Sequence, residues 1–189
     1  MNSATLIDSE THPDVWVHTL GPTGTNCEAA ARHWLTTNGY SEDHVELHPT
    51  LEVAAEAVIG RPGHVLLGCI VYPDLNHLVF QNLGTMSLVD CFIIPTHSMV
   101  VAGDMGSERP LVASHPAPVN LLDAWNPEVQ LVTSNAEAAL VCARGEVDAC
   151  VTTSVAAAAA GLPIVQDFGP VPMGFSIHAP STADVLTAR

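Results

Sequence analysis

Residues 18–35, HTLGPTGTNCEAAARHWL, place a Gly-Pro-Thr-Gly-Thr turn directly before an alanine-rich helical pattern. The apolar residues that precede the turn predict a buried strand, and those that follow it predict a helix beginning near Thr25. Free backbone amides at a helix start favour a carboxylate or phosphate, and glycine lets a ligand approach the backbone closely. The turn is therefore either an anion-binding loop or simply a tight strand-to-helix connection.

The same alternation of strand and helix continues along the chain. Strands are expected at residues 15–21, 45–50, 64–71, 92–103, 110–116, 129–134, 148–154, 163–169 and 173–179, and helices at 25–39, 51–63, 118–125, 135–146 and 155–162. Strands separated by helical segments of about a dozen residues are typical of crossover units. The sequence therefore predicts an α/β fold with mainly parallel sheets.

Two segments share a pattern in which a hydroxyl residue is followed three positions later by glutamate. They are Thr25 with Glu28 in the first half and Ser134 with Glu137 in the second. In such a capping box the hydroxyl accepts from a helical amide while the glutamate reaches back to the cap amide. The echo indicates two similar lobes, although capping boxes are common enough to recur by coincidence.

Hydroxyl and amide side chains follow several of the expected strands. Because ligands bind at the carboxyl ends of strands in open α/β sheets, these loops should meet at one crevice. The candidate binding residues there are Thr25, Asn26, Ser114, Thr133, Ser134, Asn135 and Thr153. Cys27 is expected at the second helical position, where the helix dipole lowers a thiol pKa; the alternative is a small buried residue that packs the turn.

Charge and composition exclude several classes of protein. The 189 residues include 20 acidic and five basic ones, and the net charge of -15 disfavours nucleic acid as a partner. All five basic residues are arginine, so a Schiff-base mechanism, which needs a lysine amine, is excluded. No stretch reaches the roughly 18 to 20 apolar residues of a membrane helix, and the acidic start of the chain is unlike a secretory signal. We therefore expect a cytoplasmic protein without membrane partners.

The five cysteines are scattered and form no CxxC pair. This pattern argues against both a disulfide framework and a zinc knuckle, so reduced thiols are the default. No metal and no cofactor are expected. A homodimer is one assembly that the sequence allows.

Four motifs, taken in order, resemble those of prephenate dehydratases. GPTGTNCEAA (21–30) resembles GPxGTFSxxAA, ASHPAPVNLL (113–122) resembles SHPQALxQC, TSNAEAA (133–139) resembles STAxAA, and DACVTTSVAAAAAGL (148–162) resembles AAIAS...AA...YGL. The resemblance covers most of residues 16–178. It implies two α/β lobes like those of a type II periplasmic binding protein, with a prephenate-like small carboxylate in the cleft between them.

The departures from that family also carry information. The dehydratases have Thr-Arg-Phe near the end of the catalytic domain, where this chain reads VPMGFSIHA (171–179), and their ENSxxG segment is replaced by CIVYPDLNHLVF (69–80). The threonine and arginine serve to expel the ring hydroxyl and to support the substrate, so dehydration to phenylpyruvate is not expected. The chain resembles instead the non-aromatising prephenate decarboxylases of bacilysin-type antibiotic pathways.

Three elements carry this narrower resemblance. The first is SHPxPxNL, which includes Ser114 and His115. The second is a Tyr-Asp-hydrophobic-x-His element with Tyr72 and His77, and the third is a PM-x-aromatic-S stretch at residues 172–176. A proline inserted after Tyr72 and the Asn26-Cys27 pair in place of Phe-Ser leave the substrate open. The resemblance implies a cofactor-independent carboxy-lyase with His115, His77 or Cys27 as the proton donor. Met173 and Phe175 are expected either to line the apolar wall of the site or to pack in the core, and Ser176 is expected to bind the substrate.

The expected organisation is a leader at residues 1–15 and a catalytic domain at 16–189 without an ACT domain. Lobe 1 is expected to comprise residues 16–95 plus 165–189, and lobe 2 residues 96–164. Two alternatives stay open: a related dehydratase or lyase acting on another small carboxylate, and a ligand-binding module without catalysis.

Overall fold

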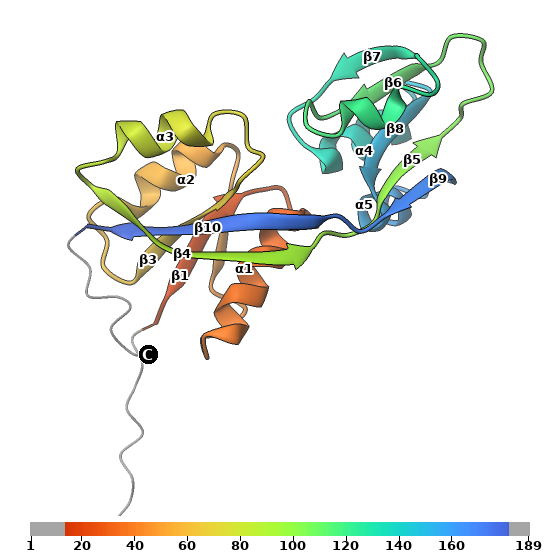
Figure 1. The fold of residues 1–189 in the computed structure, drawn as a ribbon. Coiled ribbons are helices and arrows are strands. Elements are labelled where there is room, and N and C mark those ends of the chain that lie inside the picture. The colour runs from red at the N-terminus through yellow and green to blue at the C-terminus, as the bar shows by residue number, and fades with distance from the viewer. Residues whose placement is uncertain (1–13, 182–189) are drawn as a thin grey trace, which may run out of the picture.

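Two five-stranded sheets divide residues 14–181, which are the residues that the computed structural model describes (Figure 1). The first sheet has the order β2-β1-β3-β10-β4 and the second the order β7-β6-β8-β5-β9. The strands of the first are β1 (Trp16–Leu20), β2 (Val45–His48), β3 (His64–Cys69), β4 (Met86–Pro95) and β10 (Pro172–Pro180). Those of the second are β5 (Met99–Gly103), β6 (Leu111–Ser114), β7 (Glu128–Leu131), β8 (Ala149–Thr153) and β9 (Ile164–Gly169).

Each sheet contains one strand that runs against the other four. In the first sheet β1, β2 and β3 pair in parallel, while β10 is antiparallel to both β3 and β4. In the second sheet β6, β7 and β8 pair in parallel, while β5 is antiparallel to both β8 and β9. Four strands of each sheet therefore share a direction, and the prediction of mainly parallel sheets is confirmed with one reversed strand per lobe.

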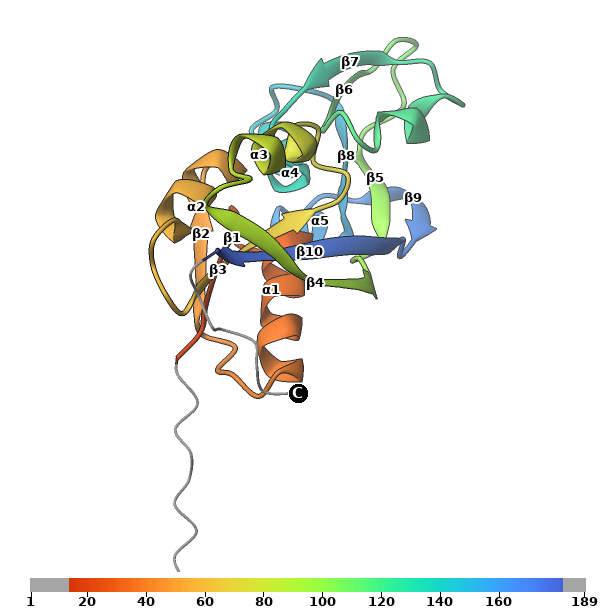
Figure 2. The same ribbon diagram turned by 60° about the vertical axis from the view of Figure 1, so that its left-hand side comes forward.

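Helices cover both faces of the first sheet (Figure 2). One face packs against α1 (Asn26–Thr37) through a cluster that includes Leu35, Val65 and Phe175, and the other against α2 (Leu51–Val58) and α3 (Leu75–Gln81). On the second sheet, α4 (Asn135–Ala143) and α5 (Ser154–Ala159) both pack against one face, and Leu122 of a 3₁₀ turn packs against the other. Coverage on both faces explains why the central strands are almost continuously apolar.

The chain crosses twice between the lobes. Residues 96–98 join β4 to β5, and residues 170–171 join β9 to β10. The two crossovers are hydrogen-bonded to each other, because the Thr96 amide donates to the Val171 carbonyl at 2.9 Å and the Val171 amide donates to Thr96 Oγ1 at 3.0 Å. This double connection forms a hinge between the two sheets.

Several expected elements differ in the structure. The predicted strand at 92–103 is two strands separated by the hinge, and the predicted helix at 118–125 is only a 3₁₀ turn at Val119–Leu122. The expected lobe boundary at residue 165 also moves, because β9 pairs with β5 in the second sheet and the chain returns only after Gly169. Most of the expected leader lies outside the described residues. Among residues 14–181, no helix is long and apolar enough to cross a membrane.

Candidate active site

A cavity of about 330 Å³ lies between the lobes, where the parallel strands of both sheets end. The first lobe contributes the turn before α1, the ends of β1 and β3 and the start of β10. The second contributes the loop after β6, the start of α4 and the end of β8. Convergence of strand ends at one crevice is the arrangement that the sequence predicted.

Nine of the sequence-predicted site residues line this cavity. They are Thr25, Asn26, Cys27, His115, Thr133, Ser134, Asn135, Thr153 and Met173. The first three come from the first lobe and the next five from the second, so a ligand in the cavity would contact both lobes.

The other four predicted residues lie outside the cavity lining. His77 is exposed on α3, with its Nε2 atom 2.7 Å from Nε2 of Gln81. Ser114 is fully buried, and its hydroxyl donates to the carbonyl of His115 at 2.9 Å. Phe175 belongs to the core of the first lobe, and Ser176 is buried beside it. Phe175 lies on the same face of β10 as Met173 but is buried in the core, whereas Ser176 lies on the opposite face.

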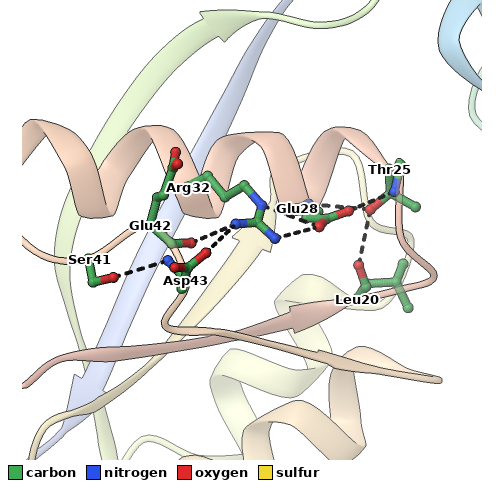
Figure 3. Close-up of polar contacts among 8 residues, drawn as sticks. Leu20, Thr25, Glu28, Arg32, Ser41, Glu42 and Asp43 are labelled. Atoms are coloured by element: carbon green, nitrogen blue, oxygen red, sulfur yellow. Dashed lines mark hydrogen bonds and ion pairs between the residues drawn. The ribbon is translucent and has the colours of Figure 1, made fainter.

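A capping box fixes the start of α1 (Figure 3). Thr25 Oγ1 accepts from the Glu28 amide at 3.3 Å, and Glu28 Oε2 accepts from the Gly24 amide at 2.6 Å. The Arg32 guanidinium donates to Glu28 Oε1 at 3.0 and 3.3 Å and also to the carbonyl of Glu42 at 2.9 Å. The predicted box is thus present, with the glutamate one residue further back than expected.

The start of α4 repeats this arrangement in the second lobe. Ser134 Oγ accepts from the Glu137 amide at 3.0 Å, while Glu137 Oε2 accepts from the Thr133 amide at 2.7 Å and from the Thr133 hydroxyl. These bonds lower the pKa of Glu137, since they stabilise its charged form. Both glutamates therefore accept hydrogen bonds at the outer side of a helix start.

The two helix starts give the cavity its electrostatic character. The first amides of a helix have no intrahelical acceptor, and the helix dipole makes that end electropositive. Asn26 and Cys27 of α1 and Asn135 and Ala136 of α4 are such positions, and all four line the cavity. Among the described residues that line it, none is aspartate, glutamate, lysine or arginine. Backbone amides and neutral side chains are thus the groups that meet an anion there.

Cys27 occupies the second helical position, as expected, but its thiol is not acidified. Burial, together with a smaller contribution from the neighbouring Cys69, raises its pKa to about 12. The prediction that the helix dipole lowers this pKa was wrong, because the thiolate loses more free energy through loss of water than it gains from the helix dipole. Cys27 is therefore a protonated thiol at neutral pH.

His115 reaches the cavity from the loop after β6. Its Nδ1 atom accepts a hydrogen bond from the Ala117 amide at 3.2 Å, so the neutral ring carries its proton on Nε2. Burial lowers the pKa of His115, because the charged imidazolium is less well solvated there. The residue can therefore offer one N–H to a ligand while its other nitrogen is held by the backbone.

Tyr72 also lines the cavity, although the sequence assigned it no role beyond its motif. Its hydroxyl lies 3.1 and 3.0 Å from the two carboxylate oxygens of Glu52 on α2. Burial and this carboxylate raise the pKa of Tyr72 to about 12. Leu20, Leu51 and Val71 complete an apolar wall. These residues come from separate elements, so local spacing carried no signal for their meeting.

Solved structures with the same fold include two enzymes and a periplasmic domain. A structure described as GqqA, a novel type of quorum quenching acylases, matches with a TM-score of 0.57 and 16% identity over 86% of this chain and 63% of that one. The prephenate dehydratase of Staphylococcus aureus matches with a TM-score of 0.55 and 14% identity, over 87% of this chain and 66% of that one. The periplasmic VFT2 domain of Bordetella pertussis BvgS gives 0.52 and 17%, over 89% and 81%.

This chain thus spans about two thirds of the first two of these structures. The likenesses confirm an α/β, two-lobed fold of the type II periplasmic-binding-protein class.

Sequence comparison indicates which enzymes of this fold the chain resembles. No family model matches the chain. The prephenate decarboxylase of Bacillus subtilis strain 168 is 26% identical over 182 residues, which span 90% of this chain and 89% of that protein. The prephenate decarboxylase of Bacillus amyloliquefaciens is 26% identical over 175 residues, or 86% and 85% of the two chains. Over most of its length the chain is therefore similar in sequence to prephenate decarboxylases.

Proposed function

We propose that the cavity binds prephenate and removes its ring carboxylate as carbon dioxide without aromatising the ring. The observation that carries this proposal is a cavity without charged side chains between two helix starts, in a chain related to prephenate decarboxylases. Prephenate is a dianion, with one carboxylate on the ring and one on the pyruvyl side chain. Two separate electropositive helix ends suit a ligand with two separate carboxylates.

The charge balance in this cavity favours loss of a carboxylate. Each helix start is equivalent to roughly half a positive charge, so the two together offset about one of the two negative charges. A ring carboxylate held against Leu20, Val71 and Met173 is poorly solvated, whereas the carbon dioxide that leaves is neutral. Transfer from water to such a wall raises the energy of the charged ground state more than that of the transition state.

The reaction then needs one proton. As the bond between the ring and its carboxylate breaks, the electron pair stays with the ring and forms a new double bond. The adjacent alkene pair shifts, and the ring carbon at its far end takes a proton. The ring hydroxyl is retained, so the acid must reach carbon and not the hydroxyl oxygen.

His115 is the group that we assign as the acid. Its Nδ1 atom accepts from the Ala117 amide in the neutral ring, which carries its proton on Nε2. To act as an acid through Nε2, the ring would take up a second proton at Nδ1 and give up the hydrogen bond from Ala117. The Cys27 thiol is the second candidate, since it is protonated and lines the cavity from the first lobe, opposite His115. We do not assign this role to His77, which its motif suggested, because its side chain is exposed on α3 outside the cavity lining.

The test is incubation of the purified protein with prephenate at neutral pH. Carbon dioxide release and the proton NMR spectrum of the ring are followed together, with a protein-free sample to measure spontaneous aromatisation. Carbon dioxide with a hydroxylated dihydro ring supports the proposal. Phenylpyruvate would instead establish a dehydratase, and unchanged prephenate with saturable binding would establish a ligand-binding module.

Variants assign the proton donor. His115→Asn is expected to lower kcat at least ~100-fold, the usual lower limit for a general acid. His33→Ala is the matched control, because His33 is exposed on α1 and does not line the cavity. His77→Ala should behave like this control. A loss below tenfold in folded His115→Asn would remove His115 from the mechanism and direct attention to Cys27→Ala.

The pathway and product are inferred from the motifs alone. The resemblance to bacilysin-type decarboxylases favours a dihydro-4-hydroxyphenylpyruvate that enters antibiotic biosynthesis. The NMR spectrum of the product tests its structure directly.

A further inference from the structure

A row of histidines lies on the first sheet, outside the cavity lining. His44, Glu46 and His48 alternate along HVELH, so their side chains share one face of the sheet. On the neighbouring strand β1, His18 is paired with Glu46, and Leu20 with His48. On its other side, β1 brings Trp16 opposite His64 of β3. Three strands therefore place imidazole groups and a carboxylate near one another on the first sheet.

The donor atoms of three of these side chains lie close together. His18 Nδ1 lies 2.9 Å from His48 Nε2, 3.7 Å from Glu46 Oε2, and His48 Nε2 lies 3.8 Å from Glu46 Oε1. A tetrahedral zinc ion with bonds of about 2.0–2.2 Å holds its ligand atoms roughly 3.4 Å apart. The two carboxylate distances are too long for hydrogen bonds, and each involves a different oxygen of Glu46. All three separations lie within about 0.5 Å of the zinc spacing, so the carboxylate faces both imidazoles with one oxygen each.

We propose that His18 Nδ1, His48 Nε2 and the Glu46 carboxylate form a zinc-binding site, with water completing the coordination. Two imidazole nitrogens and one carboxylate are a ligand set that suits zinc, and three protein ligands leave one position open. The same three residues bring their donor atoms within 4.8 Å of one another.

The surroundings of His18 support this assignment. Its Nε2 atom lies 2.7 Å from His64 Nδ1, so the nitrogen on the far side of the ring has its own hydrogen-bond partner. Such a partner fixes the tautomer and the orientation of a metal-binding imidazole. Without an ion, the 2.9 Å contact between His18 Nδ1 and His48 Nε2 is a hydrogen bond between the two rings. An ion would take the place of the shared proton.

Access to the site is from the edge of the sheet. His18 is fully buried, whereas the side chains of His48 and Glu46 are 10% and 49% exposed, and β2 is the outermost strand. The net charge of -15 favours approach of a cation. The positive charge of Arg61 would repel a cation near His18 and His64. Arg61 is exposed, however, and its Nη1 atom donates to the Ala57 carbonyl.

The ion would stabilise the first lobe without touching substrate. Its ligands join β1 to β2 immediately before the turn at Gly21, whose amide donates to the His48 carbonyl at 2.8 Å. None of the three ligands lines the cavity. We therefore expect zinc to raise the melting temperature of the protein and to take no part in catalysis.

The experiment uses the whole chain, treated with chelator, desalted and titrated with zinc chloride by calorimetry. One equivalent should bind with high affinity, and His48→Ala should weaken this binding at least ~100-fold. Loss of a residue that only hydrogen-bonds to a metal ligand usually costs less than this. Glu46→Gln is the second variant, since Glu46 is exposed and its substitution leaves the buried packing intact. His33→Ala, on α1, is the control and should bind zinc as the unmodified protein does.

Two further measurements make the outcome decisive. X-ray absorption of the zinc-loaded protein should show only nitrogen and oxygen neighbours, and zinc should raise the melting temperature of the control but not of His48→Ala. Sulfur neighbours would place the ion at the cysteines and overturn the proposal. Equal affinity in His48→Ala, Glu46→Gln and the control, or no binding at excess zinc, would show that the cluster is only a hydrogen-bonded network.

Discussion

Glu28→Ala tests how strongly one buried carboxylate holds the cavity wall in place (Figure 3). The Glu28 side chain is only 10% exposed, and it accepts from the Gly24 amide at 2.6 Å as well as from Arg32. Hydrogen bonds to a charged group contribute about 1.5–3 kcal/mol, whereas a partly exposed ion pair contributes about 0–1 kcal/mol. Arg32 is 39% exposed, so most of the loss should come from the Gly24 bond.

These contributions set the expected order of the variants. Glu28→Ala should lower the free energy of unfolding by about 2–3 kcal/mol, since it removes the carboxylate and leaves the Gly24 amide without its acceptor. Arg32→Ala should lower it by at most about 1 kcal/mol, because the carboxylate stays on the amide. Glu28→Gln keeps a neutral acceptor and should fall between them.

Urea unfolding followed by circular dichroism, with the slope compared among variants, measures these differences. A Glu28→Ala cost within about 0.5 kcal/mol of zero, or equal to that of Arg32→Ala, would refute the reasoning. In the folded variant, Thr25, Asn26 and Cys27 should also be less well positioned. If prephenate is the substrate, its KM should rise in Glu28→Ala and change little in Arg32→Ala.

Three further predictions concern other parts of the chain. Gly103→Ala should cost more stability than Gly39→Ala: both glycines have positive φ, but a Cβ at Gly103 would lie 2.6 Å from the Asp148 carbonyl oxygen, while the space at Gly39 is open. Urea unfolding of the two variants checks this order. Burial lowers the pKa of His178, so as the pH falls below about 6.5 the unfolded chain binds the proton first and stability declines. The decline should be shallower in His178→Gln in pH-dependent melting curves. Iodoacetamide should label exposed Cys91 well before Cys27, whose raised pKa keeps it protonated, and peptide mass spectrometry measures both rates.

Local patterns predicted the features that depend on a few neighbouring residues. The capping boxes at Thr25 and Ser134 were predictable because a cap is formed within one turn of helix. The cavity residues beside those caps followed, since strand ends in such sheets converge. The exposed position of His77 was not predictable from its motif, because the facing direction of α3 depends on how it packs over the first sheet.

Features that depend on distant contacts could not be predicted. The reversal of β5 and β10 is set by pairing with β8 and β3, which are far away in the sequence. The pKa of Cys27 was predicted in the wrong direction for the same reason, because its burial depends on other elements of the first lobe. Residues 118–125 carry an apolar helical pattern, yet the 3₁₀ turn ends at Leu122, where the chain turns toward β7.

The charge-free lining of the cavity bears directly on the proposed chemistry. Of the four arginines that the structure describes, none lines the cavity. A guanidinium beside the ring carboxylate would bind prephenate more tightly, but it would stabilise the charge that decarboxylation must remove from that group. In the proposed complex, helix amides would hold the ligand through partial charges, and these amides cannot supply a proton to the ring hydroxyl as readily as an acidic side chain can. The negative charge of the ring carboxylate would be only weakly offset, and His115 would be the single proton donor. Both conditions would favour loss of carbon dioxide over loss of water.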